Sequence, residues 1–304
     1  MTADLQKNKI TVLMSTYNGE KYLTEQIESI LNQRNVNVNI LVRDDGSTDQ
    51  TLTILKKYQE KGALEFYTGE NLGPQRSFLH LLQHAPQCDY YAFADQDDVW
   101  MADKISVAVN RLKTSGTKPA IYVCQTQMTD QVLNPIATPS LSPLLTFGES
   151  LIYAFASGCT MVMNDSMRKI VNAYCPQFID MHDKWIMEIA TAIGADIYFD
   201  KKSHILYRQH ERNAIGLHDS FAKEWKLRIH RVLFSNHIRY RMATELKKGY
   251  YHVMPKEQQA IISLFLSAKN SFVKRLQLLN DRRFRCGNKK TNILFKLAVL
   301  LNTY

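Results

Sequence analysis

The stretch YYAFADQDDVW, residues 90–100, places three carboxylates directly after a short apolar segment. Residues 90–94 have the composition of a buried strand. Carboxylates this close together raise one another's pKa unless a positive charge neutralises them. Mg2+ binds one or two protein carboxylates and leaves the rest of its shell to substrate phosphates. The stretch therefore predicts either a metal site that holds a diphosphate or an acidic turn that caps the following helix.

Strand and helix signals alternate through the residues that precede this stretch. Strands are predicted at 10–14, 40–42, 64–67 and 90–94, and helices within 20–31, 49–58 and 77–84. This order indicates a mostly parallel α/β sheet with helices on both faces, whose ligands bind beyond the carboxyl ends of the strands. Four polar segments follow these strands, so we expect one binding site at that edge: STYNGE (15–20), RDDGSTD (43–49), ENLG (70–73) and DQDD (95–98).

The charge of the chain is unevenly distributed. Residues 1–200 hold 16 Lys and Arg against 23 Asp and Glu, a net charge of −7, whereas residues 201–304 hold 22 against 6, a net charge of +16. A basic tail of this kind indicates an anionic partner, either nucleic acid or an anionic membrane surface. The acidic first two-thirds and the lack of a nucleic-acid-binding motif argue against nucleic acid.

Cysteine spacing and hydropathy indicate a cytosolic protein. The five cysteines are dispersed, with no CxxC pair, which is typical of reduced thiols rather than of a disulfide framework. The polar start of the chain has no apolar signal-peptide core. No stretch reaches the roughly 18 apolar residues of a membrane span. We therefore expect a cytoplasmic protein that is peripheral to the inner face of a bacterial plasma membrane.

The second half of the chain is less regular. Residues 134–148 read as a long loop, and residues 196–199 read as a strand. From about residue 219 the pattern is helical, basic and amphipathic, and it ends in ILFKLAVLL (293–301). This last segment either lies in the interface of an anionic membrane or packs on the catalytic domain or a second subunit, as in a homodimer.

Seven segments in this order and spacing resemble the family 2 glycosyltransferases, which are inverting enzymes with the GT-A fold. They are STYNGEKYLTEQIESIL (15–31), RDDGSTDQT (43–51), NLGPQRSF (71–78), ADQDDVW (94–100), ASGCTMV (156–162), HDKW (182–185) and YRQHERNAIG (207–216). The resemblance is greatest to bacterial rhamnosyltransferases of surface-polysaccharide, capsule or cell-wall assembly. It implies a GT-A domain over residues 1–216, with a mixed, mostly parallel sheet, and a helical basic region over 217–304.

The resemblance also assigns the metal ligands and the base. Asp97 and Asp95 would bind Mg2+ or Mn2+, with His210 as the third ligand, and Asp98 would share either task. Expulsion of a nucleoside diphosphate requires this neutralisation of charge. Asp183 matches the position of the carboxylate base that deprotonates the acceptor hydroxyl. A helix N-cap is the simpler reading of Asp183, and Asp180 is its nearest rival for the role of base.

The donor-binding residues implied by the resemblance lie on the loops after the strands. One of the pair Asp44 and Asp45 would accept a hydrogen bond from the imide N–H of the base, and Gly158 and Cys159 would line the sugar pocket. The other donor-binding residues are Thr16, Tyr17, Asn18, Asn71, Arg76, Asp95 and Gln96. Arg208 or Arg212 would neutralise the diphosphate. Ser47-Thr48-Asp49 reads mainly as a helix cap.

The resulting interpretation is an inverting, metal-dependent transferase that moves L-rhamnose from dTDP-rhamnose to a lipid-linked glycan. A UDP-hexose or UDP-N-acetylhexosamine donor is the main alternative, because enzymes for these sugars share the first four segments. A nucleotidyltransferase would share the sheet and the metal, but STYNGE is not the Gly-rich, basic loop expected after its first strand. A non-catalytic nucleotide-sugar-binding protein is disfavoured because the acidic run and the candidate base are both present.

Overall fold

The structure is a computed structural model that describes residues 8–153, 155–210 and 237–304. Contacts divide the chain into two compact units. The first contains residues up to 139, 156–172 and 196–210, and the second contains 140–155, 173–195 and the described residues from 237 onward. The predicted domain boundary at residue 216 lies in 211–236, outside the described residues.

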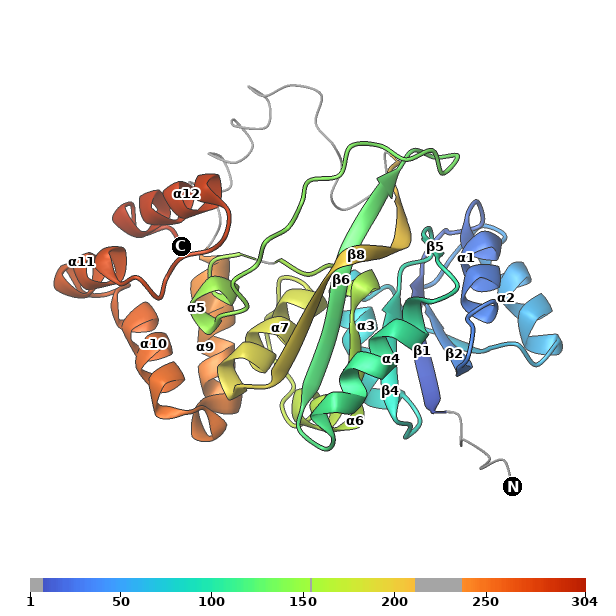
Figure 1. The fold of residues 1–304 in the computed structure, drawn as a ribbon, viewed down its shortest axis with the longest axis horizontal. Helices are drawn as coiled ribbons and strands as arrows, with labels where there is room; N and C mark the ends of the chain where they lie inside the picture. The colour runs from blue at the N-terminus through green and yellow to red at the C-terminus, as the bar shows by residue number, and fades with distance from the viewer. Residues whose placement is uncertain (1–7, 154, 211–236) are drawn as a thin grey trace. The chain divides into compact units, whose positions relative to one another are not determined.

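The first unit is built on one mixed sheet with the strand order β3-β2-β1-β4-β7-β6-β8-β5. Figure 1 labels β1, β2, β4, β5, β6 and β8 of this sheet. The strands are β1 (Lys9–Thr16), β2 (Asn37–Asp44), β3 (Glu65–Thr68), β4 (Tyr90–Ala94), β5 (Val99–Trp100), β6 (Ala120–Thr129), β7 (Val162–Asn164) and β8 (Asp196–Arg208). The strands β1 to β4 are mutually parallel, as predicted, whereas β7 is antiparallel to both β4 and β6.

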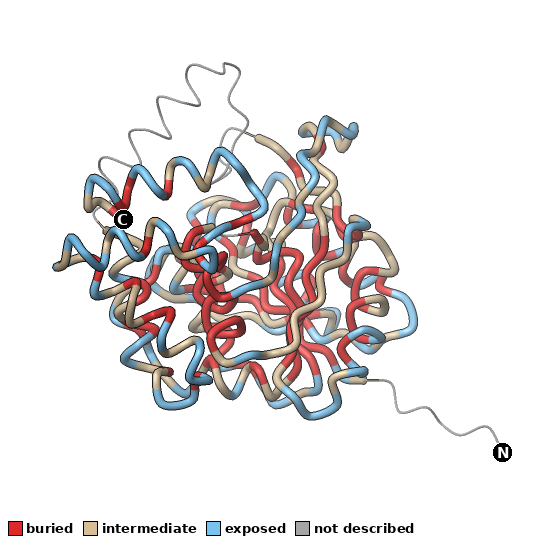
Figure 2. Tube along the Cα trace, turned by 60° about the vertical axis from the view of Figure 1, so that its left-hand side comes forward, coloured by how far each residue is buried: buried red, intermediate tan, exposed pale blue. Residues whose placement is uncertain are grey.

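Helices cover both faces of the sheet. They are α1 (Leu23–Leu31), α2 (Thr51–Glu60), α3 (Gly73–His84), α4 (Lys104–Leu112) and α6 (Asp165–Asn172). Val12 and Ala92 point into the core that contains α1, α2 and α4, and Phe93 points to the other face, where its ring meets Phe78 of α3. Because successive residues of β4 face the two covered sides of the sheet, all of β4 is buried. Figure 2 shows the buried residues gathered in the interior and the exposed residues on the outer turns.

Two element boundaries differ from the prediction for identifiable reasons. Helix α3 begins at Gly73 instead of Ser77, because Pro74 is well tolerated at the start of a helix. Strand β8 runs from Asp196 to Arg208 instead of ending at 199. Between the pairs Cys124–Asp200 and Gln125–Ser203 the register shifts, so two extra residues of β8 bulge out and the strand continues past a polar segment that resembles a turn.

The second unit is helical. Its helices are α5 (Phe147–Ser150), α7 (His182–Ile193), α9 (Ile238–Tyr250), α10 (Lys256–Ser267), α11 (Phe272–Asn280) and α12 (Lys289–Leu300). Short 3-10 turns in the two units cover Lys113–Ser115, Gly158–Thr160 and Tyr251–Val253. The ring of Trp185 on α7 packs against Tyr174 and Tyr250 at centroid distances of 6.5 and 6.0 Å. The predicted helical character of the tail is confirmed for the described residues from 238 onward.

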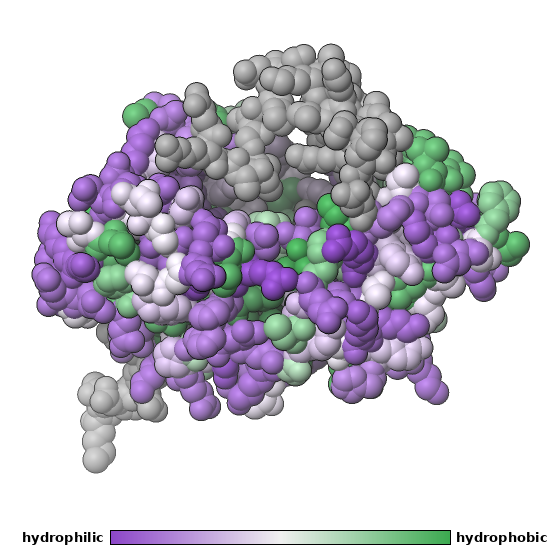
Figure 3. Space-filling view, turned by 180° about the vertical axis from the view of Figure 1, so that it is seen from behind, coloured by the Kyte–Doolittle hydropathy of each residue, from purple (hydrophilic) through white to green (hydrophobic). Residues whose placement is uncertain are grey.

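The surface of the second unit is not uniformly polar. On the face drawn in Figure 3, hydrophobic side chains gather at the right-hand edge, over α11 and α12. Within the described residues, no helix combines the length and the hydropathy that are needed to cross a membrane.

Candidate donor-binding and catalytic site

The register of the parallel strands brings the predicted loops to one edge of the sheet. Thr16 at the end of β1 pairs with Asp44 at the end of β2, and Asp44 pairs in turn with Thr68 of β3. On the other side of β1, Met14 pairs with Ala94, directly before the acidic run. The polar segments that follow these four strands are therefore neighbours, as the sequence predicts.

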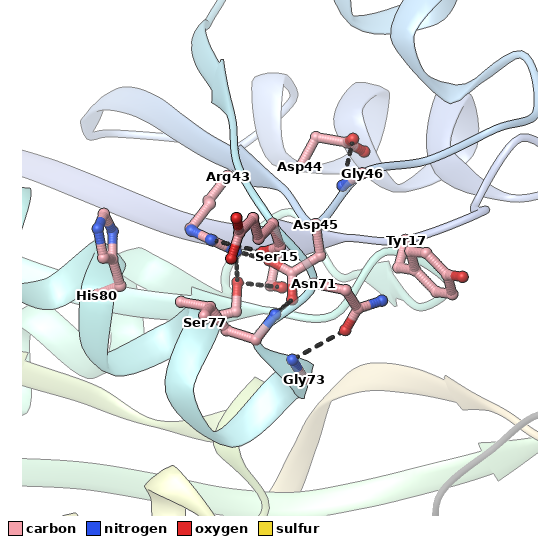
Figure 4. Close-up of polar contacts among 12 residues, drawn as sticks. Ser15, Tyr17, Arg43, Asp44, Asp45, Gly46, Asn71, Gly73, Ser77 and His80 are labelled. Carbon is pink, nitrogen blue, oxygen red and sulfur yellow. Dashed lines mark hydrogen bonds and ion pairs between the residues drawn. The ribbon is translucent and has the colours of Figure 1, made fainter.

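The side chain of Asp44 stabilises the turn that follows β2 by accepting hydrogen bonds from it. Its carboxylate is completely buried and accepts hydrogen bonds from the hydroxyls of Thr16 (2.8 Å) and Ser47 (2.6 Å) and from the backbone N–H groups of Gly46 (3.1 Å) and Ser47 (2.8 Å). Gly46 has a φ of +82°, which an L side chain would strain. Figure 4 shows Asp44 directed toward this turn and away from Asp45. Asp44 therefore has a structural role.

Asp45 faces a different set of partners. It forms an ion pair with Arg43 and accepts a hydrogen bond from the backbone N–H of Leu72 (3.1 Å). The Arg43 guanidinium also donates to the carbonyl oxygen of Glu70 (2.9 Å) and to the hydroxyl of Ser77 (3.3 Å). These contacts hold the Asp45 carboxylate between β2 and the loop before α3 (Figure 4).

The first loop is fixed by contacts from its neighbours. The Tyr17 backbone N–H donates to Gln96 Oε1 (2.9 Å), and Gln96 Nε2 donates to the Tyr17 carbonyl oxygen (3.1 Å). Asn18 accepts at Oδ1 from the Thr48 backbone N–H (2.9 Å). The side chains of Thr16, Asn18 and Gln96 therefore position the loop, whereas the ring of Tyr17 is 49% exposed at the edge.

The third loop presents polar side chains to solvent. Asn71 is exposed, and its Oδ1 accepts from the backbone N–H of Gly73 (3.0 Å) at the start of α3. Arg76 is exposed one turn later on the same helix. Both residues therefore lie at the edge predicted to bind the donor.

Asp97 and His210 meet although 113 residues separate them. Asp97 Oδ2 lies 2.8 Å from His210 Nε2, and both side chains are partly exposed. The His210 ring stacks on Tyr22, with centroids 5.3 Å apart, which fixes its orientation. Two ligands of one octahedral ion, each about 2.1 Å from it, lie about 3 Å apart. An oxygen and an imidazole nitrogen at this spacing fit a divalent cation.

Asp98 does not share the exposure of its neighbours. Burial, together with the charges of Asp97 and Asp95, raises the pKa of the Asp98 carboxyl well above its usual range. The ligand atoms of Asp95, Asp98 and Cys159 lie within 4.8 Å of one another. Burial also raises the pKa of the Cys159 thiol, so the sulfur stays protonated and is a poor ligand for a hard cation. Within the run, Asp95 and Asp97 are partly exposed, whereas Asp98 is completely buried.

Arg208 is a structural residue. It is 2% exposed, and its guanidinium donates to the carbonyl oxygens of Asp97 and Gln131 and to the carboxylate of Glu25. These contacts join the acidic run to α1 and to the loop after β6, so the buried guanidinium is already engaged and does not serve as the predicted partner of a diphosphate. The other predicted partner, Arg212, lies outside the described residues.

Lys104 is a buried cation that the sequence patterns did not single out. It is completely buried, and its Nζ lies 3.4 Å from the centroid of the Trp100 ring. Burial lowers the pKa of Lys104 to about 8, against the opposing influence of Asp98 and Asp95. Lys104 lies four residues before the buried Ala108, so the helical spacing already places it on the apolar side of α4, and its charge is the reason that it was not singled out.

Gly158 and Cys159, predicted to line the sugar pocket, form a 3-10 turn before β7. Both residues are buried, and Cys159 belongs to the hydrophobic core of the first unit. Its thiol is therefore not presented at the surface. The five cysteines are free, in agreement with their dispersed spacing.

Asp183 lies in the first turn of α7, in the second unit. The N-cap of this helix is Met181, so the reading of Asp183 as the N-cap is wrong. The side chain is partly exposed, and its Oδ1 accepts from the Lys184 backbone N–H (2.6 Å). Asp180, the rival carboxylate, is 41% exposed and lies 3.6 Å from the Lys184 ammonium.

Comparison with known proteins identifies the family. Residues 11–170 match the model of the glycosyl transferase family 2 domain, which is more than half of the chain. This protein is a family 2 glycosyltransferase. The transferase is 30% identical over 244 residues to the dTDP-rhamnosyl transferase RfbG of Shigella flexneri, an alignment that covers 70% of this chain and 77% of RfbG.

Solved structures confirm the predicted GT-A fold of the transferase. Residues 1–349 of S. aureus TarS in complex with UDP superpose with a TM-score of 0.59 at 17% identity, over 97% of this chain and 88% of that one. The mannosyltransferase PcManGT from Pyrobaculum calidifontis, in complex with GDP-Man and Mn2+, gives a TM-score of 0.55 at 16% identity, over 98% and 88% of the two chains.

The stability of the transferase is predicted to depend on Asp44. Asp44→Ala should lower the free energy of unfolding by about 3 kcal/mol, because it leaves several buried donors without an acceptor. Asp44→Asn should cost less, since the hydroxyls of Thr16 and Ser47 can rotate to suit an amide. Urea unfolding of the two variants measures both values. A loss below about 1 kcal/mol for alanine would contradict the structural role.

Glu188 is buried on α7, one turn after Lys184. Burial raises the pKa of Glu188 to about 7, with Asp180 adding to the rise and Lys184 and Arg239 opposing it. A carboxyl whose pKa is raised in the folded state favours folding most below its unfolded pKa, and this stability is lost as the pH rises toward 7. Glu188→Gln should therefore flatten the fall in stability between about pH 4.5 and 7 and leave the protein about 2–3 kcal/mol more stable at pH 8. Urea unfolding at pH 5 and pH 8 tests this, and an unchanged pH dependence would contradict it.

Proposed function

We propose that this transferase moves L-rhamnose from dTDP-rhamnose to a lipid-linked glycan of a bacterial surface polysaccharide, at the cytoplasmic face of the plasma membrane. The observation that carries the proposal is the similarity to a dTDP-rhamnosyl transferase over 70% of the chain. The site supports it, because the polar loops after β1, β2 and β3 lie at the same edge of the sheet as the acidic run after β4.

In this proposal Asp45 recognises the base. Its carboxylate is fixed by Arg43 and by the Leu72 backbone N–H, and it accepts a hydrogen bond from the imide N–H of thymine. Asp44 is excluded from this role because the turn uses its carboxylate fully. The exposed ring of Tyr17 and the side chains of Asn71 and Arg76 complete the nucleoside side of the site.

Asp97 and His210, with Asp95 beside them, would hold Mg2+ or Mn2+ in this proposal. A bound divalent cation acts as a Lewis acid that neutralises the charge developing on a departing nucleoside diphosphate. Two neighbouring residues orient these ligands. The ring of Tyr22 stacks on His210, and Arg208 donates a hydrogen bond to the backbone carbonyl oxygen of Asp97.

Asp183 is the proposed base. A sugar hydroxyl is a poor nucleophile at neutral pH, so a carboxylate must take its proton as it attacks the anomeric carbon. One such in-line displacement, in which the C–O bond to the acceptor forms as the bond to the diphosphate breaks, inverts the anomeric configuration. The proton passes to Asp183, and dTDP leaves.

Donor hydrolysis tests the proposal. Purified protein is incubated with Mn2+ or Mg2+ and a panel of dTDP- and UDP-sugars, and the release of nucleoside diphosphate is measured. We expect metal-dependent turnover of dTDP-rhamnose alone. Turnover of UDP-glucose or UDP-N-acetylglucosamine instead would overturn the rhamnose assignment and keep the transferase.

If none of the nucleotide sugars is hydrolysed, the binding of dTDP and UDP in the presence of Mn2+ is measured by calorimetry. Tight binding of dTDP with no hydrolysis would show that the donor site is correct and that turnover requires the acceptor. If neither nucleotide binds, the proposed donor site is wrong.

A further inference from the structure

Helix α12 has two apolar stripes on different sides. Its first stripe, with Phe295, Ala298 and Val299, is buried within the second unit. The second stripe consists of Ile293, Leu297, Leu300 and Leu301, which are 63%, 37%, 57% and 48% exposed. These positions recur at spacings of four, three and one residues, which places them on one side of the helix. A surface helix usually has a single apolar stripe facing the core, so the second stripe has no structural use within the described residues.

Helix α11, which contacts α12, repeats this feature. Phe272, Val273 and Leu276 are 66%, 64% and 42% exposed, and Leu278 is the one buried residue of the helix. The hydrophobic side chains over the two helices are visible at the edge of Figure 3. Adjoining exposed apolar residues of this kind mark an interaction surface.

The segment that contains α11 and α12 is strongly basic. Residues 271–304 hold eight Lys and Arg against one acidic residue, Asp281, a net charge of +7. The bonds of Asp281 go to Arg283, so they neutralise one cation at most. Lys289 and Lys290 are exposed at the start of α12, in line with its apolar stripe. Long basic side chains beside exposed leucines are typical of helices that lie in a membrane interface.

We propose that α11 and α12 form a docking surface for an anionic lipid bilayer, in which the exposed apolar side chains enter the interface and the surrounding cations contact lipid phosphates. A second copy of this chain fits less well, because two segments that each have a net charge of +7 repel each other. Nucleic acid would pair with the cations but would leave the apolar stripes in water. A bilayer with anionic headgroups satisfies both features.

The inference is independent of the donor, because vesicle binding is measured without a nucleotide sugar. Full-length protein is sedimented with vesicles of phosphatidylcholine alone and with vesicles of phosphatidylcholine and phosphatidylglycerol in equal parts. We expect binding to the anionic vesicles and little binding to the neutral ones. Failure to bind anionic vesicles would overturn the proposal and leave the proposed transfer reaction untouched.

Two pairs of variants separate the apolar and the charged contributions. Ile293→Ser with Leu300→Ser should weaken binding to anionic vesicles about tenfold or more, whereas the control Val132→Ser, at a residue that is 73% exposed in the first unit, should not. Lys289→Glu with Lys290→Glu should weaken binding at least about thirtyfold. Lys56→Glu with Lys57→Glu, on α2, makes the same change in net charge and should have a much smaller effect.

Two further results would overturn the proposal. One is equal binding by the Ile293→Ser/Leu300→Ser variant and the unaltered protein, which would show that the apolar stripe does not enter the bilayer. The other is a dimer in analytical ultracentrifugation that this variant dissociates, which would show that a second copy covers the surface. Because all the substituted side chains are exposed, circular dichroism should confirm that each variant folds.

Discussion

Replacement of Asp97 by asparagine is expected to lower metal-dependent donor turnover by about a thousandfold. Asparagine keeps the size of the side chain and an oxygen toward His210, but it removes the negative charge that attracts a divalent cation. A bound cation contributes several kcal/mol to stabilisation of the departing diphosphate, and about 4 kcal/mol corresponds to a thousandfold in rate. The affinity for Mn2+, measured by electron paramagnetic resonance without any donor, should fall in parallel.

Asp196→Asn is the matched control for this variant. Asp196 is also a partly exposed aspartate of the first unit, and it forms an ion pair with Lys118. It begins β8, whereas His210 follows the end of that strand. Its replacement should leave both turnover and Mn2+ affinity unchanged. If Asp97→Asn bound Mn2+ as well as the unaltered protein does, Asp97 would not be a ligand.

The part of the site that the sequence predicts well depends on the regular geometry of parallel strands. Alternating strand and helix signals place the ends of β1, β2 and β4 at one edge, and hydrogen-bonded pairs such as Thr16–Asp44 confirm this. Periodicity determines these positions, since a residue at the end of a parallel strand has little freedom to lie elsewhere. His210 also lies beside the acidic run, but only the family resemblance pointed to it, because the strand predicted from the sequence ended at 199 and β8 continues to Arg208.

The parts that could not be predicted depend on burial and on which donors reach each carboxylate. Asp44 and Asp45 are adjacent in sequence, yet one completes a turn and the other faces Arg43. Asp97 and Asp98 differ in the same way, since Asp97 is partly exposed and contacts His210, whereas Asp98 is completely buried. The burial of Lys104 was not predicted either, since a lysine on a helix is ordinarily solvated. A sequence lists the charges but does not show which of them the fold removes from water.

Replacement of Asp183 by asparagine is expected to lower the rate of sugar transfer by about 10³- to 10⁴-fold while leaving the affinities for dTDP and Mn2+ unchanged. The rate should fall because an amide cannot take the proton of the acceptor hydroxyl, and general bases contribute up to about 10⁴-fold. The affinities should persist because the proposed nucleotide and cation ligands all belong to the first unit, whereas Asp183 belongs to the second. Transfer to a lipid-linked acceptor and calorimetry with dTDP measure the two effects separately.

Asp180→Asn provides the control, because Asp180 precedes the same helix and is the more exposed of the two carboxylates. Transfer should be nearly unchanged in this variant, apart from the effect of losing the ion pair with Lys184, which is small for an exposed carboxylate. The opposite result, with activity lost in Asp180→Asn and kept in Asp183→Asn, would move the base to Asp180. A loss of dTDP binding in Asp183→Asn would point to a different error, because it would show that Asp183 supports the donor site and not only the proton transfer.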